Sequence, residues 1–192
     1  DRLKGAQTAT WIGSNVFYGV EMWGTLDWSV PLDEPLGPNP MVGRHVIARS
    51  HFEDLWVGYN TTEMIDSKVR MEGNTLINPS NCGFVVGGYT VNTRNRVAPN
   101  RIELSTDFAV GICLGGERGL AVQNRISGHG WSGIYLSSAT RTGVVANDVS
   151  DLTVAPDGAR VYLEASTSKN LVVVRDEEDV LDLGTDNRII VR

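Results

Sequence analysis

The stretch from residue 111 to residue 149 repeats itself, and this repeat limits the available folds more than any other feature of the chain. Gly111-Ile112-Cys113-Leu114 returns 22 residues later as Gly133-Ile134-Tyr135-Leu136, and Asn124-Arg125-Ile126-Ser127 returns 23 residues later as Asn147-Asp148-Val149-Ser150. A unit this short cannot bury its own apolar face, so it must stack on copies of itself. Its apolar runs of three to five residues, separated by Gly, Ser and Asn, are typical of short strands joined by tight turns. We therefore expect a coil that rises one strand spacing per repeat, which is a parallel β-helix.

A column of residues spaced by one coil can be followed through most of the chain. Its members are the middle residues of apolar triplets, and successive members are 29, 28, 22 and 27 residues apart. They are Trp56, Val85, Cys113, Tyr135 and Tyr162. Because side chains alternate across a strand, this column should face outward and the flanking residues should face the core. The ten flanking residues are Leu55, Val57, Phe84, Val86, Ile112, Leu114, Ile134, Leu136, Val161 and Leu163.

A second column consists of asparagines at the turns. Asn74, Asn100, Asn124 and Asn147 follow one another at intervals of 26, 24 and 23 residues. Asparagine tolerates left-handed backbone angles in turns, and stacked side-chain amides can hydrogen-bond along a ladder. The alignment of the last coil places Val174 where the next asparagine is expected, so it leaves Asn170 outside this column.

The pattern Asn-x-Ile/Val-x-Gly followed by Gly-Ile-x-Leu resembles the right-handed parallel β-helix repeat of the pectate-lyase-like superfamily. The resemblance covers roughly residues 44–174. It implies an all-β fold, a right-handed single-stranded parallel β-helix (solenoid) of about seven coils of 22–29 residues. It does not select a function, because this fold hosts lyases, hydrolases, epimerases, phage tailspikes and non-catalytic surface proteins.

Composition and charge limit the number of domains in the chain and the kinds of partner that it can bind. Its 192 residues read as one domain, residues 1–192, with a Pro-rich loop insertion at residues 27–43. Residues 1–10 are too few and too polar to cover the open end of a coil, so we expect the C-terminal part of a longer protein, or a partner chain over that end. The net charge of −6 argues against a nucleic-acid partner but leaves room for local basic clusters that would bind acidic polysaccharides. No apolar run reaches the roughly 20 residues of a membrane span.

The two cysteines fall in neighbouring coils but at different positions along the strand. Cys82 stands before its apolar triplet, whereas Cys113 is the middle residue of its own. This offset predicts sulfur atoms too far apart for a disulfide.

The outward column suggests a surface for sugars. Sugars present flat C–H faces that pack on aromatic rings, and rings at one-coil intervals suit a linear polymer. The candidate glycan-binding residues are Trp56, Trp131, Tyr135 and Tyr162. The alternative is that these are ordinary outward aromatic residues of strands, covered by loops.

Polar residues just before the strands suggest a catalytic group. Asp107 and His129 both stand six residues before their outward-column residue, so neighbouring coils should place them about 4.8 Å apart. A carboxylate at that distance can orient an imidazole for proton transfer. Asp157 lies two coils from Asp107, roughly 9.6 Å away, near the upper end of the separation for an inverting glycosidase pair. The alternative is a polar pair in an ordinary turn.

No motif completes a catalytic or metal site. Gly128-His129-Gly130 resembles the Gly-His-Gly of polygalacturonases, but that family's Asn-Thr-Asp, Asp-Asp and Arg-Ile-Lys motifs are absent from this sequence, and the tripeptide reads as a turn. A calcium-dependent lyase would need clustered carboxylates with a basic residue, and nothing tighter than Glu53-Asp54 occurs near the outward column. The three His and two Cys lack zinc-ligand spacing. We therefore expect no cofactor; calcium is the alternative, without a motif to support it.

Two functions remain. The first is a non-catalytic β-helix module for glycan binding, surface attachment or structural spacing. The second is a polysaccharide hydrolase or lyase, or a fragment of one, that acts along the outward column. The absence of a complete catalytic motif favours the first. A polysaccharide or cell-surface glycan as partner implies an extracellular or cell-surface location.

Overall fold

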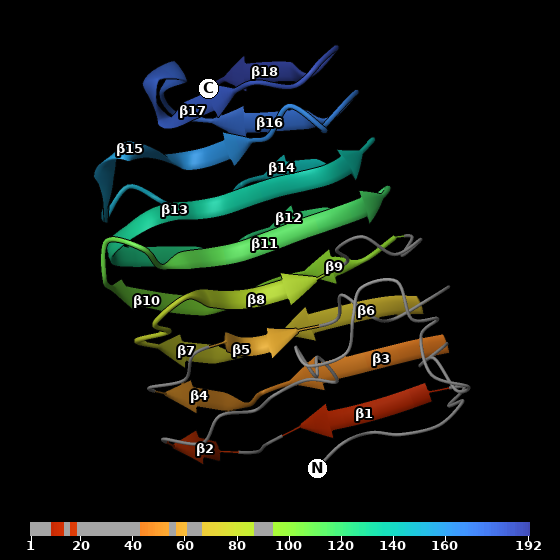
Figure 1. The fold of residues 1–192 in the computed structure, drawn as a ribbon. Coiled ribbons are helices and arrows are strands. Elements are labelled where there is room, and N and C mark those ends of the chain that lie inside the picture. Colours follow the sequence, from red (N-terminus) through yellow and green to blue (C-terminus); the bar gives the residue numbers. More distant parts are fainter. Residues whose placement is uncertain (1–8, 14–15, 19–42, 54–56, 61–66, 87–93) are drawn as a thin grey trace, which may run out of the picture.

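The computed structural model of the chain is a parallel β-solenoid (Figure 1). It describes residues 9–13, 16–18, 43–53, 57–60, 67–86 and 94–192. The chain runs to the right along the front of the coil and returns behind it while it climbs toward the C-terminus, so the coil is right-handed (Figure 1). Within the described residues, the single helical segment is the 3-10 turn η1 (Glu177–Asp179). The predicted all-β, right-handed parallel β-helix is confirmed.

One face of the solenoid is a sheet of eight parallel strands. In stacking order they are β1 (Ala9–Gly13), β3 (Gly43–Ala48), β6 (Ser67–Glu72), β9 (Arg96–Val97), β12 (Leu120–Val122), β14 (Gly143–Val145), β16 (Leu171–Val174) and β18 (Arg188–Val191). Each strand pairs in parallel with the equivalent strand of the next coil. This face stacks eight strands, so the number of coils differs slightly from the seven that we expected.

The other strands form the two remaining faces of the solenoid. Two long strands, β13 (Arg125–Thr140) and β15 (Leu152–Leu163), run through both of these faces. β13 pairs through its first half with β10 and through its second half with β11, and β15 follows β13 along both halves. The shorter strands of these faces are β2 (Val16–Tyr18), β4 (His51–Glu53), β7 (Thr75–Ile77), β10 (Arg101–Ser105), β5 (Val57–Asn60), β8 (Cys82–Val86), β11 (Val110–Glu117) and β17 (Val180–Asp182). The solenoid therefore has an eight-stranded face and two faces that β13 and β15 join.

The core is the inside of the coil, and the repeat predicted most of it. Eight of the ten predicted inward residues are no more than 1% exposed. They are Phe84, Val86, Ile112, Leu114, Ile134, Leu136, Val161 and Leu163. Cys113 pairs with Val85 on one side and with Tyr135 on the other, and Tyr135 pairs with Tyr162. These four partly exposed residues therefore form the outward column, as predicted.

The glycine that opens each repeat is needed because neighbouring coils approach closely at that point. A Cβ on Gly111 would lie 2.6 Å from the carbonyl oxygen of Gly133, and a Cβ on Gly133 would lie 2.8 Å from that of Arg160. Real Cβ atoms do not come this close to a carbonyl oxygen. The first residue of the Gly-Ile-x-Leu pattern is therefore set by backbone packing.

The predicted register of one coil is wrong. Leu55 and Trp56 lie outside the described residues, but the strand that follows them shows the true register. β5 places Tyr59 opposite Phe84 and Asn60 opposite Val85. Asn60, and not Trp56, is therefore the residue that pairs with Val85. An apolar triplet is too short to fix its own register when coils differ in length.

The asparagine column is confirmed and extends by one residue. Asn74, Asn100 and Asn124 each donate from the side-chain nitrogen to the side-chain oxygen of the next asparagine, at 2.9 to 3.0 Å. The backbone N–H of each donates to the same oxygen. Ser50 precedes the column, since its backbone N–H donates to the Asn74 Oδ1 atom. Together these bonds satisfy turn N–H groups throughout the middle of the solenoid.

A second amide column, which the sequence alignment excluded, runs along another turn. Asn170 is 1% exposed and donates from its backbone and side-chain nitrogens to the Asn187 Oδ1 atom, at 2.9 and 3.0 Å. The backbone N–H of Thr142 in turn donates to the Asn170 Oδ1 atom at 2.8 Å. The column escaped notice because the spacing from Asn170 to Asn187 is only 17 residues, below the expected 22–29.

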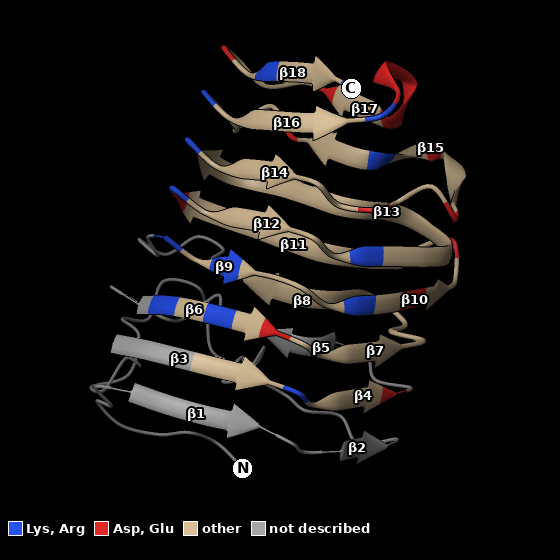
Figure 2. Ribbon diagram, turned by 180° about the vertical axis from the view of Figure 1, so that it is seen from behind, with Lys and Arg blue, Asp and Glu red and all other residues tan. Residues whose placement is uncertain are grey.

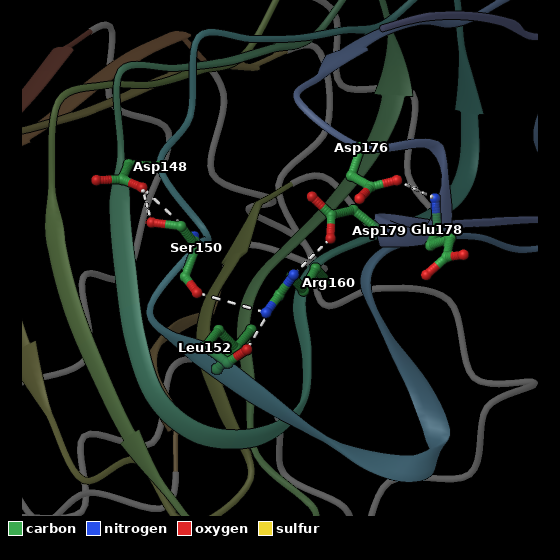
Figure 3. A network of polar contacts seen from close by, with 7 residues as sticks. All are labelled: Asp148, Ser150, Leu152, Arg160, Asp176, Glu178 and Asp179. Atoms are coloured by element: carbon green, nitrogen blue, oxygen red, sulfur yellow. Dashed lines mark hydrogen bonds and ion pairs between the residues drawn. The ribbon is translucent and has the colours of Figure 1, made fainter.

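A cluster around Arg160 ties the end of the chain to the coil (Figure 3). The guanidinium of Arg160 donates to the Asp179 Oδ1 atom at 2.6 Å and to the Leu152 carbonyl oxygen at 3.0 Å. Asp179 is only 8% exposed and follows the cap of η1, where Asp176 accepts from the backbone N–H of Glu178. A charge-assisted hydrogen bond from β15 thus holds the 3-10 turn η1, which lies between β16 and β17.

The Pro-rich loop predicted at residues 27–43 lies outside the described residues except for Gly43, the first residue of β3.

Candidate functional site

The predicted pair of Asp107 and His129 is in contact. The His129 Nε2 atom lies 2.6 Å from the Asp107 Oδ1 atom, and both side chains are about half exposed or more, at 49% and 62%. The pairing of β10 with β13 places Ser105, and not Asp107, opposite His129. Asp107 instead belongs to the turn between β10 and β11 and reaches His129 from there. The predicted contact is therefore present. The register of β11 and β13 that predicted it is observed from Val110 onward but does not extend to His129.

The glycines on either side of His129 lie within a strand and not in a turn, and they allow close packing against the preceding coil. Gly128-His129-Gly130 lies inside β13, so the predicted turn is wrong. Gly128 has a φ of +95°, and a Cβ there would collide with the Leu104 carbonyl oxygen. A Cβ on Gly130 would lie 2.8 Å from the Ala109 carbonyl oxygen. The tripeptide therefore reflects close packing against the preceding coil.

The third predicted acid, Asp157, lies in a bulge beside the same site. The pairing of β13 with β15 shifts register between residues 154 and 159, and Asp157 falls within that shift. Asp157 and Asp107 both line an open depression of about 400 Å³. The depression is lined by Asp107, Phe108, Trp131, Ala155, Pro156 and Asp157.

Three of the four predicted aromatic residues form one cluster on the outward face. The ring centroids of Trp131 and Tyr162 lie 4.8 Å apart, those of Tyr135 and Tyr162 lie 5.5 Å apart, and those of Trp131 and Tyr135 lie 5.6 Å apart. All three side chains are partly exposed. Trp131 also lines the depression, so the rings continue from it along the outward column. The fourth residue, Trp56, lies outside the described residues.

A carboxylate beside the rings was missed by the sequence reasoning. Glu164 accepts hydrogen bonds from the Ser137 hydroxyl at 2.6 Å and from the Ser166 hydroxyl at 3.1 Å, and the Ser137 bond lowers the pKa of Glu164 despite partial burial. Burial, and then the negative charge of Glu164, raise the pKa of Tyr135 to about 12. Tyr135 therefore keeps its proton and presents a hydroxyl donor next to an ionised acceptor.

Phe108 was also missed, although the sequence contained a signal for it. Its side chain is 81% exposed and lines the depression with Trp131. A phenylalanine in the polar turn Ser105-Thr106-Asp107-Phe108 has no core to enter, and this could have marked it as a surface contact. The exposed aromatic surface at the site is therefore larger than the outward column predicted.

One column of turns carries mostly basic residues (Figure 2). The turns before β9, β12, β14 and β16 each carry an exposed basic residue with a left-handed φ between 55° and 59°. These residues are Arg94, Arg118, Arg141 and Lys169. Glu117 pairs with Arg141 at 2.7 Å and with Arg118 at 3.5 Å, so the column is only partly neutralised. Equivalent turns of stacked coils are about 4.8 Å apart, so this is a local basic cluster in an acidic chain.

No protein family, curated protein or solved structure matches the chain. The described part of the chain has no helix that is long and apolar enough to cross a membrane. Among the described residues, no group of three or more His, Cys, Asp or Glu side chains could hold a metal ion.

Proposed function

We propose that the protein is a non-catalytic β-helix module that binds a polysaccharide or cell-surface glycan along its outward aromatic column. We also propose, from the repeat pattern, that it is related to the pectate-lyase-like β-helix proteins. The observation that carries the proposal is the continuity between the ring cluster and the depression. Trp131 belongs to both, and the exposed ring of Phe108 forms another wall of the depression.

The chemistry of this surface suits a sugar chain. Aromatic rings pack against sugar C–H faces, and carboxylates accept hydrogen bonds from sugar hydroxyls. Asp107, Asp157 and Glu164 supply such acceptors beside the rings. The basic residues in the turns before β9, β12, β14 and β16 would add a contact for acidic glycans. Binding of this kind would serve attachment at an extracellular or cell surface.

The contact between His129 and Asp107 favours a second candidate, a polysaccharide hydrolase or lyase. A carboxylate that accepts from the imidazole can orient it for proton transfer. Asp107 lines the open depression, and both side chains of the pair are well exposed to water. An exposed pair of this kind is equally compatible with a binding surface. Because no complete catalytic motif accompanies it in the sequence, we prefer the non-catalytic function.

The test is a glycan array with neutral and acidic oligosaccharides, followed by calorimetry on the best ligand. Phe108→Ala and Tyr135→Ala should each weaken binding by about 5- to 30-fold, the range expected of one aromatic contact. Leu183→Ala is the control, because Leu183 is also exposed, at 51%, but lies outside the site. Absence of binding to every glycan would leave structural spacing as the function.

His129→Ala separates the two candidates. It should keep glycan binding, and wild type and variant should both lack activity in a reducing-sugar assay. Turnover by wild type that falls about 10²- to 10⁴-fold in the variant would instead identify an enzyme with His129 in proton transfer.

A further inference from the structure

The two cysteines of the chain are in direct contact. The Cys113 Sγ atom lies 3.4 Å from the Cys82 Sγ atom, and both residues are free and partly exposed. The strand register is offset as predicted, since Cys82 pairs with Val110 and Cys113 with Val85. The predicted separation of the sulfur atoms is nevertheless wrong.

A break in the alternation of β8 brings the sulfur atoms together. Gly83 and Phe84 are successive buried residues, whereas a regular strand would turn only one of them inward. A Cβ on Gly83 would lie 2.5 Å from the Leu76 Cδ2 atom, inside the core. This break turns Cys82 toward the face that carries Cys113.

The local contacts make the two thiols unequal. The Cys113 thiol donates to the Cys82 sulfur, and this hydrogen bond lowers the pKa of Cys82. The same bond, together with burial, raises the pKa of Cys113 well above its ordinary value. Cys82 is therefore the more nucleophilic partner at neutral pH, because the thiolate is the reactive form.

We propose that Cys82 and Cys113 form a thiol oxidation site that closes to a disulfide between adjacent coils when the protein meets a small-molecule disulfide such as oxidised glutathione. The Cys82 thiolate attacks one sulfur of the oxidant, breaks its S–S bond and releases one glutathione thiolate. Cys113 then loses its proton and attacks the Cys82 sulfur of the mixed disulfide, which releases the second glutathione. The protein thiols lose two electrons and two protons, and the glutathione disulfide gains both.

In the second step the sulfur atoms must close from 3.4 Å to a bond of about 2.05 Å. Closing the bond also requires movement of the backbone, because Cys113 stands three residues beyond Val110, the residue that pairs with Cys82. The bond would connect residues that are 31 positions apart in sequence. A link of this span restricts the unfolded chain and should raise the melting temperature by roughly 5–15 °C.

The experiment treats the folded protein with oxidised glutathione, blocks remaining thiols with N-ethylmaleimide and identifies tryptic peptides by mass spectrometry. Trypsin leaves Cys82 in residues 71–94 and Cys113 in residues 102–118. We expect these two peptides to be linked within one chain, the mass to fall by two hydrogen atoms, and the melting temperature to rise until a reductant is added.

Single variants check the order of the steps. Cys113→Ser should stop at the mixed disulfide, with one glutathione on Cys82, while Cys82→Ser should react much more slowly at Cys113. Circular dichroism should show both variants folded. Glutathione retained on both cysteines of the wild type without a linked peptide, links only between chains, or links only after denaturation would each overturn the proposal.

Discussion

The side-chain oxygen of Asn124 accepts two hydrogen bonds from Asn100, one from its backbone N–H and one from its side-chain nitrogen, each at 3.0 Å. Asn124 itself is 0% exposed and donates onward to Asn147. Its side-chain nitrogen also donates to the Val97 carbonyl oxygen at 2.8 Å. A single amide therefore satisfies polar groups on the coils before and after its own.

Replacing this amide should be costly. Asn124→Ala leaves the Asn100 donors, the Val97 carbonyl oxygen and the Asn147 side-chain oxygen with fewer partners in a site without water access. We expect the free energy of unfolding to fall by about 1–3 kcal/mol, the usual penalty for unsatisfied buried groups. Urea denaturation followed by circular dichroism measures this change.

Two further variants control the interpretation. Asn170→Ala should cost about as much as Asn124→Ala, because Asn170 is equally buried in the second amide column. Asn81→Ala should change stability by less than about 0.5 kcal/mol, because Asn81 is exposed. A small loss at Asn170 would mean that the second column does not contribute to stability.

The sequence predicted the coil wherever identical residues recur at similar spacing. Gly111 and Gly133 precede strand segments that pair in register, and the pattern around them placed the core and the outward column correctly. The second amide column was missed because it mixes residue types, with Thr142 beside Asn170, and because its last step is short. The coil near Trp56 was placed in the wrong register because an apolar triplet is too short to fix its own register when coils differ in length.

The candidate site was predictable in part. Alternation along β13 identified Tyr135 as outward, but the exposed position of Phe108 depends on a turn whose path the repeat does not determine. Glu164 was missed because its partners, Ser137 and Ser166, come from two coils. The contact between the cysteines depends on a local break in strand alternation, which a count of residues along an ideal strand cannot reveal.

The register of the core can be tested with Leu136. This residue is 0% exposed, so Leu136→Asp places an unpaired carboxylate inside the coil at a cost of several kcal/mol. We expect loss of the folded state, seen as loss of the β-type circular dichroism spectrum. Leu183→Asp makes the same chemical change at a residue that is 51% exposed and should fold normally. A well-folded Leu136→Asp variant would contradict the inward position of Leu136.

The attachment of the 3-10 turn η1 to the coil depends on Arg160. Arg160→Met leaves the Asp179 carboxylate, whose side chain is only 10% exposed, without its ion-pair partner. We expect the free energy of unfolding to fall by about 1–3 kcal/mol. Arg125→Met breaks a comparable pair with Asp151, but both side chains there are more than half exposed, so its effect should stay below about 1 kcal/mol. Equal effects of the two substitutions in urea denaturation would contradict a special role for the buried pair.

The environment of Tyr135 predicts how stability changes at alkaline pH. An unfolded tyrosine ionises near pH 10, whereas burial and the charge of Glu164 raise the pKa of Tyr135 to about 12. Between these values the unfolded chain has lost a proton that the folded protein keeps, so stability must fall as pH rises. The contribution is complete below about pH 10 and is lost as pH rises through about 12. Tyr135→Phe should remove this part of the decline in urea denaturation.

Spectroscopy can assign that titration to Tyr135. While circular dichroism shows a folded protein, near-ultraviolet absorbance of the five tyrosines should include one late step, near pH 12, that Tyr135→Phe abolishes. Glu164→Gln removes a nearby negative charge and should move this step to lower pH, but not to the value of a free tyrosine, because burial is the larger cause. A late step that persists in Tyr135→Phe, or that Glu164→Gln leaves in place, would contradict this arrangement of ring and carboxylate.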